Sequence, residues 1–174
     1  MATGATFAVG YRRKRQQKTD YHRRLNLLKS EKTRFVVRPS NKSILTQLVD
    51  YHEDGDMVRV TVSSKTLGKL GWNHNLANTP AAYLTGLLCG VKGKSKGVKT
   101  AILDTGLFPQ IKCSNIYAAL KGLKDAGIES PADDSIFPSQ ERICGKVIAS
   151  YNQKAKSMEA DFAKVKEAIL RSSK

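Results

Sequence analysis

The stretch "TRFVVRPSNKSILTQLVDYHEDGDMVRVTVSS", residues 33–64, contains three strand-like runs separated by two turn-forming segments. The runs at 33–38, 42–51 and 57–64 are rich in β-branched and aromatic residues, as strands are. "PSNK" at 39–42 is rich in turn residues, and Asp54-Gly55 is a dipeptide typical of tight hairpin turns. The sequence therefore predicts an antiparallel meander of three strands.

The third run has the clearest alternation of apolar and polar residues. Successive side chains of a strand point to opposite faces of the sheet. Val58, Val60 and Val62 are therefore expected on one face, and the residues between them on the other.

The residues after the meander alternate between helical and strand-like patterns. "NTPAAYLTGLLCG" at 78–90 predicts a largely buried helix, capped by Asn78 or Thr79, with Pro80 in its first turn. "GKSKGVK" at 93–99 reads as a basic, glycine-rich loop, and "KTAILDTG" at 99–106 as a short internal strand. Two further helices are expected, at 114–127 and 139–150, capped by Ser114 and Ser139.

The last residues show one apolar stripe at helical spacing. Its members recur every three or four residues and are Tyr151, Ala155, Met158, Phe162, Val165 and Ile169. Such a stripe predicts an amphipathic helix that either packs against the domain or forms a docking face for another protein or an RNA segment.

These patterns predict a mixed α/β fold, in which the meander is followed by helix, strand, helix and helix. Three parts are expected: a basic N-terminal arm with a short helix over 1–30, a single mixed α/β domain over 31–150, and a C-terminal amphipathic helix over 151–174. No signal peptide or membrane-spanning run is apparent. Cys89, Cys113 and Cys144 have no metal-ligand spacing. A cytoplasmic protein with no cofactor, no metal and no membrane partner is expected.

Positive charge is concentrated near the N-terminus. The chain has a net charge of +15, and residues 1–38 contribute +9 of it, from eleven basic and two acidic side chains. An excess of this size indicates an acidic partner, first nucleic acid and second an anionic membrane. Arginine dominates, and its planar guanidinium binds phosphate through two bonds and stacks on bases. Tyr11, Tyr21 and His22 add flat groups, which favours folded RNA with exposed bases.

Residues 19–30 are expected to form a short helix within this arm. Thr19 or Asp20 would cap it, and Tyr21, Leu25 and Leu28 would share one face.

The residues show no catalytic constellation. Asp104 ends a strand-like run, where α/β sheets can place catalytic carboxylates, but no partner stands at an obvious spacing, and packing or helix capping is the favoured interpretation. "GKSKGVK" does not match the Walker pattern. "GWNHNLANTP", around Trp72 and His74, is either a base-stacking loop or a well-packed surface loop.

Six blocks of this sequence come in the order found in a known family: "YRRKRQQKTDYHRRLNLLKS", "RFVVRPSNKSILTQLVDY", "NTPAAYLTGLL", "AILDTGL", "YAALKGLKDAG" and "FPSQERICG". Over roughly residues 10–150 they resemble the 5S-rRNA-binding large-subunit ribosomal proteins numbered eighteen in bacteria and five in eukaryotes, and the length resembles the archaeal form. The resemblance implies a structural protein, not an enzyme, that helps attach 5S rRNA to the large rRNA in the central protuberance, beside neighbouring ribosomal proteins.

By the same resemblance, the residues expected to contact RNA are Tyr11, Arg12, Arg13, Lys14, Arg15, Lys18, Thr19, Tyr21, Arg23, Arg24, Arg34, Arg38, Ser40, Asn41 and Lys42. The Asn-Thr-Pro helix of the family matches 78–80, and no function is implied for residues after about 151. Two alternatives remain at this point: an α/β enzyme acting on RNA or nucleotides, with the arm as substrate anchor and Asp104 in its site, and a DNA-binding protein.

Overall fold

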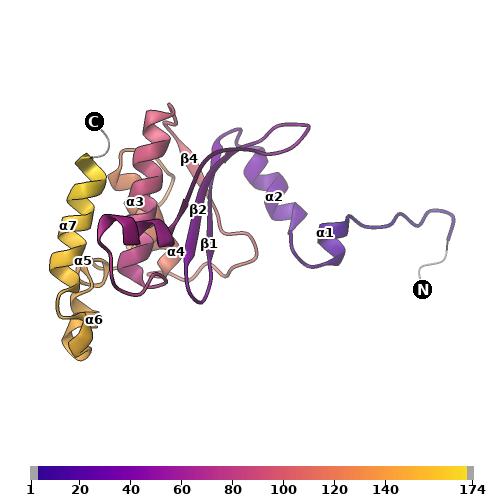
Figure 1. Cartoon of the computed structure of the whole chain (residues 1–174). Coiled ribbons are helices and arrows are strands. Elements are labelled where there is room, and N and C mark those ends of the chain that lie inside the picture. The colour runs from indigo at the N-terminus through magenta and orange to yellow at the C-terminus, as the bar shows by residue number, and fades with distance from the viewer. Residues whose placement is uncertain (1–3, 172–174) are drawn as a thin grey trace.

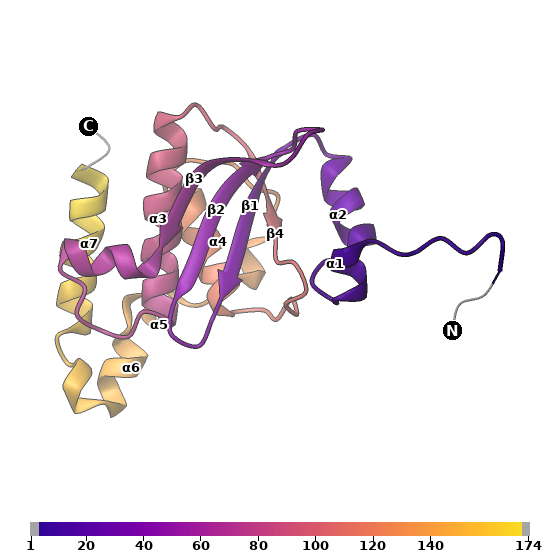
Figure 2. The same cartoon turned by 45° about the vertical axis from the view of Figure 1, so that its right-hand side comes forward.

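Strands β1 (Thr33–Pro39), β2 (Ile44–Asp50) and β3 (Met57–Ser63) form the predicted antiparallel meander in the computed structural model, which describes residues 4–171. Phe35 pairs with Leu48 across the first hairpin. The sheet order is β3-β2-β1-β4, and helices cover one of its faces (Figures 1 and 2). The mixed α/β class is confirmed. Residues 1–3 of the predicted arm and 172–174 of the predicted C-terminal helix lie outside the described residues.

A β-bulge changes the faces of the third strand. Leu48 pairs with Val60, but Val49 pairs with Val58, so that Arg59 is an extra residue on β3. Val60 and Val62 are buried at 4% and 2% exposure, whereas Val58 is 48% exposed. The expectation that the three valines share one face is therefore wrong for Val58, because one inserted residue reverses the alternation.

Strand β4 (Ala101–Asp104) is parallel to β1 and lies at the edge of the sheet. Thr33 pairs with Ala101, and Val36 pairs with Asp104. The predicted internal position is therefore wrong. The apolar run correctly indicated side chains that pack against the core, but that packing does not require a strand on both sides.

Two helices, α3 (Thr79–Ser95) and α4 (Asn115–Asp125), form the layer behind the sheet. The Asn78 side chain caps α3 by accepting a hydrogen bond from the Ala81 amide at 3.0 Å. The helices approach closely at glycines, since a Cβ atom added to Gly86 would lie 1.9 Å from the Ala119 carbonyl oxygen. Ser114 occupies the N-cap position of α4, as predicted, but its side chain makes no capping hydrogen bond.

The predicted loop at 93–99 is shorter than expected, because α3 continues to Ser95. Gly93 is buried in this last turn, and a Cβ atom there would lie 2.3 Å from a Leu48 methyl group. Packing against the sheet therefore extends the helix through a segment whose glycines favoured a loop.

The segment at 139–150 forms two short helices, α5 (Gln140–Cys144) and α6 (Lys146–Tyr151), instead of the single one predicted. Gly145 separates them with a left-handed φ of 82°. Ser139 occupies the N-cap position of α5 without a side-chain capping bond, which corrects the predicted role. Short 3-10 helices, η2 (Asp134–Ile136) and η3 (Gln153–Ala155), flank the pair.

The C-terminal helix, α7 (Met158–Arg171), begins later than predicted. Met158, Phe162, Val165 and Ile169 are buried, and α7 lies against α3 on the side away from the sheet (Figure 1). Tyr151 ends α6 and is 73% exposed, so it is not part of the stripe. Of the two roles left open for the stripe, the structure shows packing against the domain.

The connection from β3 to α3 contains a 3-10 helix, η1 (Ser64–Leu70), and the loop with the single tryptophan. Trp72 is 2% exposed, and its indole nitrogen donates to the Asn75 carbonyl at 3.2 Å. His74 joins this loop to α7 through a 3.0 Å contact with Asp161. The loop is thus a packed surface loop, and Trp72 is enclosed where a base-stacking residue would be exposed.

Candidate nucleic-acid interface

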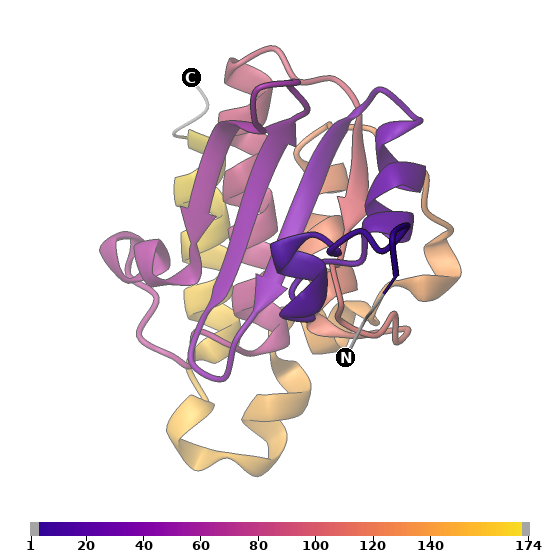
Figure 3. The same cartoon turned by 90° about the vertical axis from the view of Figure 1, so that its right-hand side faces the viewer.

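Residues 4–30 form an arm on the outer face of the sheet, the face opposite α3 and α4 (Figure 3). The arm contains two short helices, α1 (Arg12–Arg15) and α2 (Tyr21–Leu28), and neither has a buried residue. The turn after α1 closes with hydrogen bonds from the Gln17 amide to Lys14 O and from the Lys18 amide to Arg13 O. This turn folds α1 back toward α2, and the Tyr11 and Tyr21 rings meet at 5.0 Å between centroids.

Asp20 is the residue that caps α2. Its carboxylate accepts hydrogen bonds from the His22 amide at 3.0 Å and the Arg23 amide at 3.1 Å, and the Arg23 bond is the main reason that its pKa is lowered. Thr19, the other predicted cap, instead accepts a 2.8 Å hydrogen bond from Arg13 Nε. The cap therefore fixes where the helix begins, and Thr19 ties α1 to the same place.

Polar contacts attach α2 to the sheet. Arg23 Nη1 donates to the Gly106 carbonyl at 2.7 Å, and Arg24 forms a two-bond ion pair with Asp56, both bonds at 2.9 Å. Asp56 lies in the loop between β2 and β3, and Gly106 lies in the loop after β4. The arm is thus held at two loops that come from opposite edges of the sheet.

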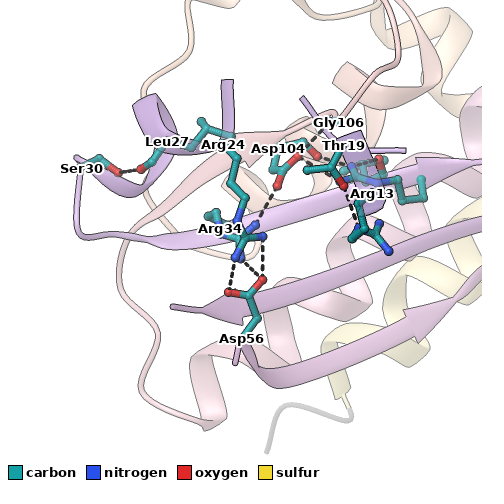
Figure 4. A network of polar contacts seen from close by, with 11 residues as sticks. Arg13, Thr19, Arg24, Leu27, Ser30, Arg34, Asp56, Asp104 and Gly106 are labelled. Atoms are coloured by element: carbon teal, nitrogen blue, oxygen red, sulfur yellow. Dashed lines mark hydrogen bonds and ion pairs between the residues drawn. The ribbon is translucent and has the colours of Figure 1, made fainter. Parts of the chain in front are cut away.

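Arg34 and Arg38 of β1 form a charge network with Asp104. Figure 4 shows Arg34 between Asp104 and Asp56. Arg34 is 4% exposed, and it contacts Asp104 Oδ2 at 3.0 Å and Asp56 Oδ2 at 2.6 Å. Arg38 Nη2 contacts Asp104 Oδ1 at 3.0 Å, and the Gly106 amide donates to the same oxygen at 2.8 Å. Gly106 has a φ of 61°, and a Cβ atom there would lie 2.9 Å from the Arg38 guanidinium, so a larger residue would displace Arg38 from its present position.

The network determines the charge states of both carboxylates. Burial alone would raise the pKa of Asp104, but the charge of Arg38 and hydrogen bonds from Arg38, Gly106 and Arg34 outweigh it and hold the pKa below its ordinary value. The Asp56 pKa is also lowered, since bonds from Arg24 and Arg34 outweigh its partial burial. Both carboxylates are therefore ionised near neutral pH and partly neutralise the surrounding arginines.

The comparisons with known proteins point to one ribosomal family. A family model described as "Ribosomal large subunit proteins 60S L5, and 50S L18" matches residues 5–98. The chain belongs to this L18/L5e family.

Curated relatives extend the match to nearly the whole chain. The chain is 46% identical to "Large ribosomal subunit protein uL18" of Korarchaeum cryptofilum over 166 residues, which cover 94% of this chain and 85% of the relative. It is 44% identical to the protein of the same name from Methanoregula boonei over 169 residues, 97% of each chain. The relatives are structural ribosomal proteins from archaea, not enzymes. Within residues 4–171, no helix is long and apolar enough to cross a membrane, and no His, Cys, Asp and Glu cluster could hold a metal.

Twelve of the fifteen predicted RNA-contacting residues in this L18/L5e protein fall into three groups. The other three, Tyr11, Thr19 and Tyr21, lie where α1 and α2 meet. The exposed basic residues of the arm are Arg12, Arg13, Lys14, Arg15 and Lys18, and only Arg13 among them makes a side-chain hydrogen bond within 4–171. An open groove of about 880 Å³ on the outer face is lined by four arginines that each donate a hydrogen bond to an acceptor within the protein: Arg23, Arg24, Arg34 and Arg38. Ser40, Asn41 and Lys42 lie in the exposed β1–β2 turn, outside this groove.

Sequence reasoning missed three residues that shape this L18/L5e surface. Asp56 holds Arg24 and Arg34, and Gly106 and Leu107 bring the loop after β4 against α2. The only available signal was the position of Asp104 at the end of a strand-like run, which was interpreted as packing. The network agrees with that interpretation, because Asp104 fixes two arginines on the neighbouring strand.

Proposed function

We propose that this protein binds 5S rRNA through the exposed arm and the outer face of the sheet, and that it helps attach 5S rRNA to the large rRNA in the central protuberance. The resemblance of the ordered sequence blocks is the reason for naming 5S rRNA and this location. The names of the relatives identify them only as proteins of the large ribosomal subunit. Neighbouring large-subunit proteins are proposed as further partners.

One observation supports RNA binding more than any other. The basic residues of α1 and its following turn are exposed on a segment that buries no side chain in the domain, so their placement does not serve the core. Each Lys or Arg that neutralises a phosphate releases a condensed counterion, and affinity accumulates with each such contact. The arm therefore has the properties of a surface whose stabilising partner is a polyanion.

The contacts of Asp104 argue against the enzyme alternative, which depended on this residue. Both carboxylate oxygens of Asp104 accept hydrogen bonds from Arg34, Arg38 or the Gly106 amide. Asp104 therefore holds Arg34 and Arg38 in place, and neither of its carboxylate oxygens is free to contact a substrate. The DNA-binding alternative is addressed by the competition experiment.

The test is a filter-binding titration of the full chain against cognate 5S rRNA at about 0.2 M salt, with transfer RNA and duplex DNA as competitors, because nonspecific polyanion binding weakens steeply with salt. Tight binding that neither competitor displaces is expected. Binding that all three nucleic acids share equally would contradict the proposed specificity for 5S rRNA.

A further inference from the structure

The two tyrosines of the arm belong to an open hollow that the sequence did not reveal. Its volume is about 640 Å³, and it lies between α1, α2 and the loop after β4. Tyr11, Tyr21, Leu25 and Leu107 provide its apolar walls, and Lys14, Gln17, Thr19, Asp20 and His22 complete the lining. We refer to these nine residues as the aromatic hollow.

The apolar walls of the aromatic hollow are exposed to a degree that requires an explanation. Tyr11 is 71% exposed, Leu25 is 55% and Leu107 is 53%. Single exposed apolar residues are ordinary, but these come from three separate segments and converge on one concavity. Exposed apolar side chains that gather around a hollow indicate a site where a ligand covers them.

The charge around the aromatic hollow identifies the kind of ligand. In the chain, the lining residues Lys14 and Gln17 are flanked by four further basic residues, all exposed: Arg12, Arg13, Arg15 and Lys18. An apolar protein segment would gain nothing from so many cations. A nucleotide combines both requirements, because its base is flat and apolar on its faces while its phosphates are anionic.

Polar groups at the margin of the aromatic hollow can form hydrogen bonds with the edge of a base. The Gln17 side-chain amide offers both donors and an acceptor, and it has no hydrogen-bond partner among residues 4–171. The backbone at Gln17 has a φ of 51°, a left-handed conformation that residues other than glycine rarely adopt, and it places Gln17 at the margin of the hollow. The turn thus holds an unpaired amide beside two tyrosine rings at the cost of local strain.

We propose that the aromatic hollow binds a single unstacked nucleobase of the bound RNA, which stacks on Tyr11 while the flanking arginines hold its phosphates. This proposal rests on the proposed function for the identity of the RNA, but an unpaired base of any RNA can enter the hollow. The two proposals can therefore fail separately.

The first experiment tests the hollow without 5S rRNA. The full chain is titrated with a short single-stranded oligoadenylate and, separately, with a blunt-ended RNA duplex of equal charge, while the ring-proton resonances of Tyr11 and Tyr21 are followed by NMR. Ring-current shifts with the single strand alone are expected, since only unpaired bases expose their faces. Equal shifts with both RNAs, or none with either, would overturn the proposal.

The second experiment uses the same 5S rRNA titration over a series of salt concentrations. Tyr11→Ala is expected to weaken binding by about 5- to 150-fold, the usual range for loss of one stacked base, with an unchanged slope of log K against log salt. Tyr11→Phe is expected to stay within about twofold of the parent, because it keeps the ring. Tyr151→Ala is the matched control, since Tyr151 is 73% exposed on α6, away from the arm.

The outcomes separate the two proposals. A Tyr11→Ala protein that binds 5S rRNA as tightly as the parent would overturn the proposal that the hollow binds a base, while leaving the proposed function intact. A parent protein that shows no preference for 5S rRNA would overturn the proposed function, and the oligoadenylate titration would still decide whether the hollow takes a base.

Discussion

The helix pair α3–α4 and the arm differ in what holds them, although both are helical. Thirteen residues of α3 are buried, whereas α1 and α2 have none. The helix pair touches backbone to backbone at Gly86 and Gly122, and its stability comes from excluding water. The arm is attached through hydrogen bonds of Arg23 and Arg24, and the ring contact between Tyr11 and Tyr21 lies within the arm itself.

The difference indicates which part of the molecule an RNA can reorganise. Arg24 and Asp56 are 30% and 26% exposed at their side chains, and such pairs contribute about 0–1 kcal/mol each. Phosphate groups compete with a carboxylate for the same guanidinium. The arm can therefore exchange its intramolecular partners for RNA without disturbing the buried helices.

The largest expected effect is on the helix pair. Gly86→Ala places a methyl group 1.9 Å from the Ala119 carbonyl oxygen, and the helices must separate to admit it. We expect the free energy of unfolding to fall by about 3 kcal/mol or more. Urea unfolding followed by the fluorescence of the buried Trp72 measures this change.

Gly68→Ala is the control, because nothing lies within 4 Å of a Cβ atom at that position. It should change the stability by less than about 0.5 kcal/mol. Equal losses for the two variants would mean that the close approach of α3 and α4 does not determine their stability.

The second effect concerns the network beneath the arm. Asp104→Asn removes one of the two carboxylate charges that compensate the buried Arg34, and we expect a loss of about 3 kcal/mol near neutral pH. Because the folded pKa of Asp104 lies below the ordinary value of 3.8, its ion pairs stabilise the fold above that pH. The contribution is lost as the pH falls through the folded pKa.

The pH dependence distinguishes charge from packing at Asp104. Urea unfolding at a series of pH values from neutral to acid should show a steeper loss for the parent than for Asp104→Asn. Asp56→Asn should cost less, about 1 kcal/mol, since Asp56 is partly exposed. Parallel pH profiles for the parent and Asp104→Asn would show that the charge of Asp104 contributes nothing.

The third effect is on RNA binding and not on stability. Replacing Arg12, Arg13 and Arg15 together by alanine should weaken binding and reduce the salt slope by roughly two to three units, near 0.9 for each lost phosphate contact. The free energy of unfolding should stay within about 0.5 kcal/mol, because none of the three is buried. Filter binding across salt concentrations and urea unfolding measure the two quantities.

A matched variant tests whether total charge alone explains the result. Lys146, Lys164 and Arg171 have side chains 64%, 78% and 83% exposed on α6 and α7, far from the arm. Their joint replacement by alanine removes the same charge and should change the slope by less than about one unit. Equal slope changes in the two triple variants would argue against a phosphate contact at α1.

The smallest effect is local to the arm. Gln17→Gly relieves the left-handed strain at φ 51° and should stabilise the turn by about 1 kcal/mol. The amide of Lys18, which bonds to Arg13 O, should then exchange about fivefold more slowly. Global unfolding should not change, because α1 is outside the core, and a change there would mean that the arm and the helix pair unfold together.

Much of this molecule could be predicted from local pattern. Residues 33–64 predicted the meander, and Asn78, one of the two predicted caps, caps the buried helix. The predictions failed where one position altered a regular element. Arg59 forms the bulge that exposes Val58, and Gly145 divides a helix expected to be continuous.

The candidate site was predicted in its composition but not in its arrangement. Exposed arginines and tyrosines of the arm were recognisable because charge and aromatic content are properties of the residues themselves. The pairing of Arg34 with Asp104, seventy residues apart, was not recognisable. Sequence placed both arginines of β1 among the RNA contacts, whereas the structure gives each an internal carboxylate partner.

The sequence by itself determined the strands, the buried helices and a basic arm, because propensity, periodicity and charge act over a few neighbouring residues. Only the tertiary structure decided that β4 lies at the edge beside β1, that Asp104 fixes two arginines, and that Leu107 joins Tyr11 and Tyr21 around one hollow. These features depend on which distant segments meet. That choice is made by packing of the whole core, where a shift of one residue or one methyl group changes every later contact.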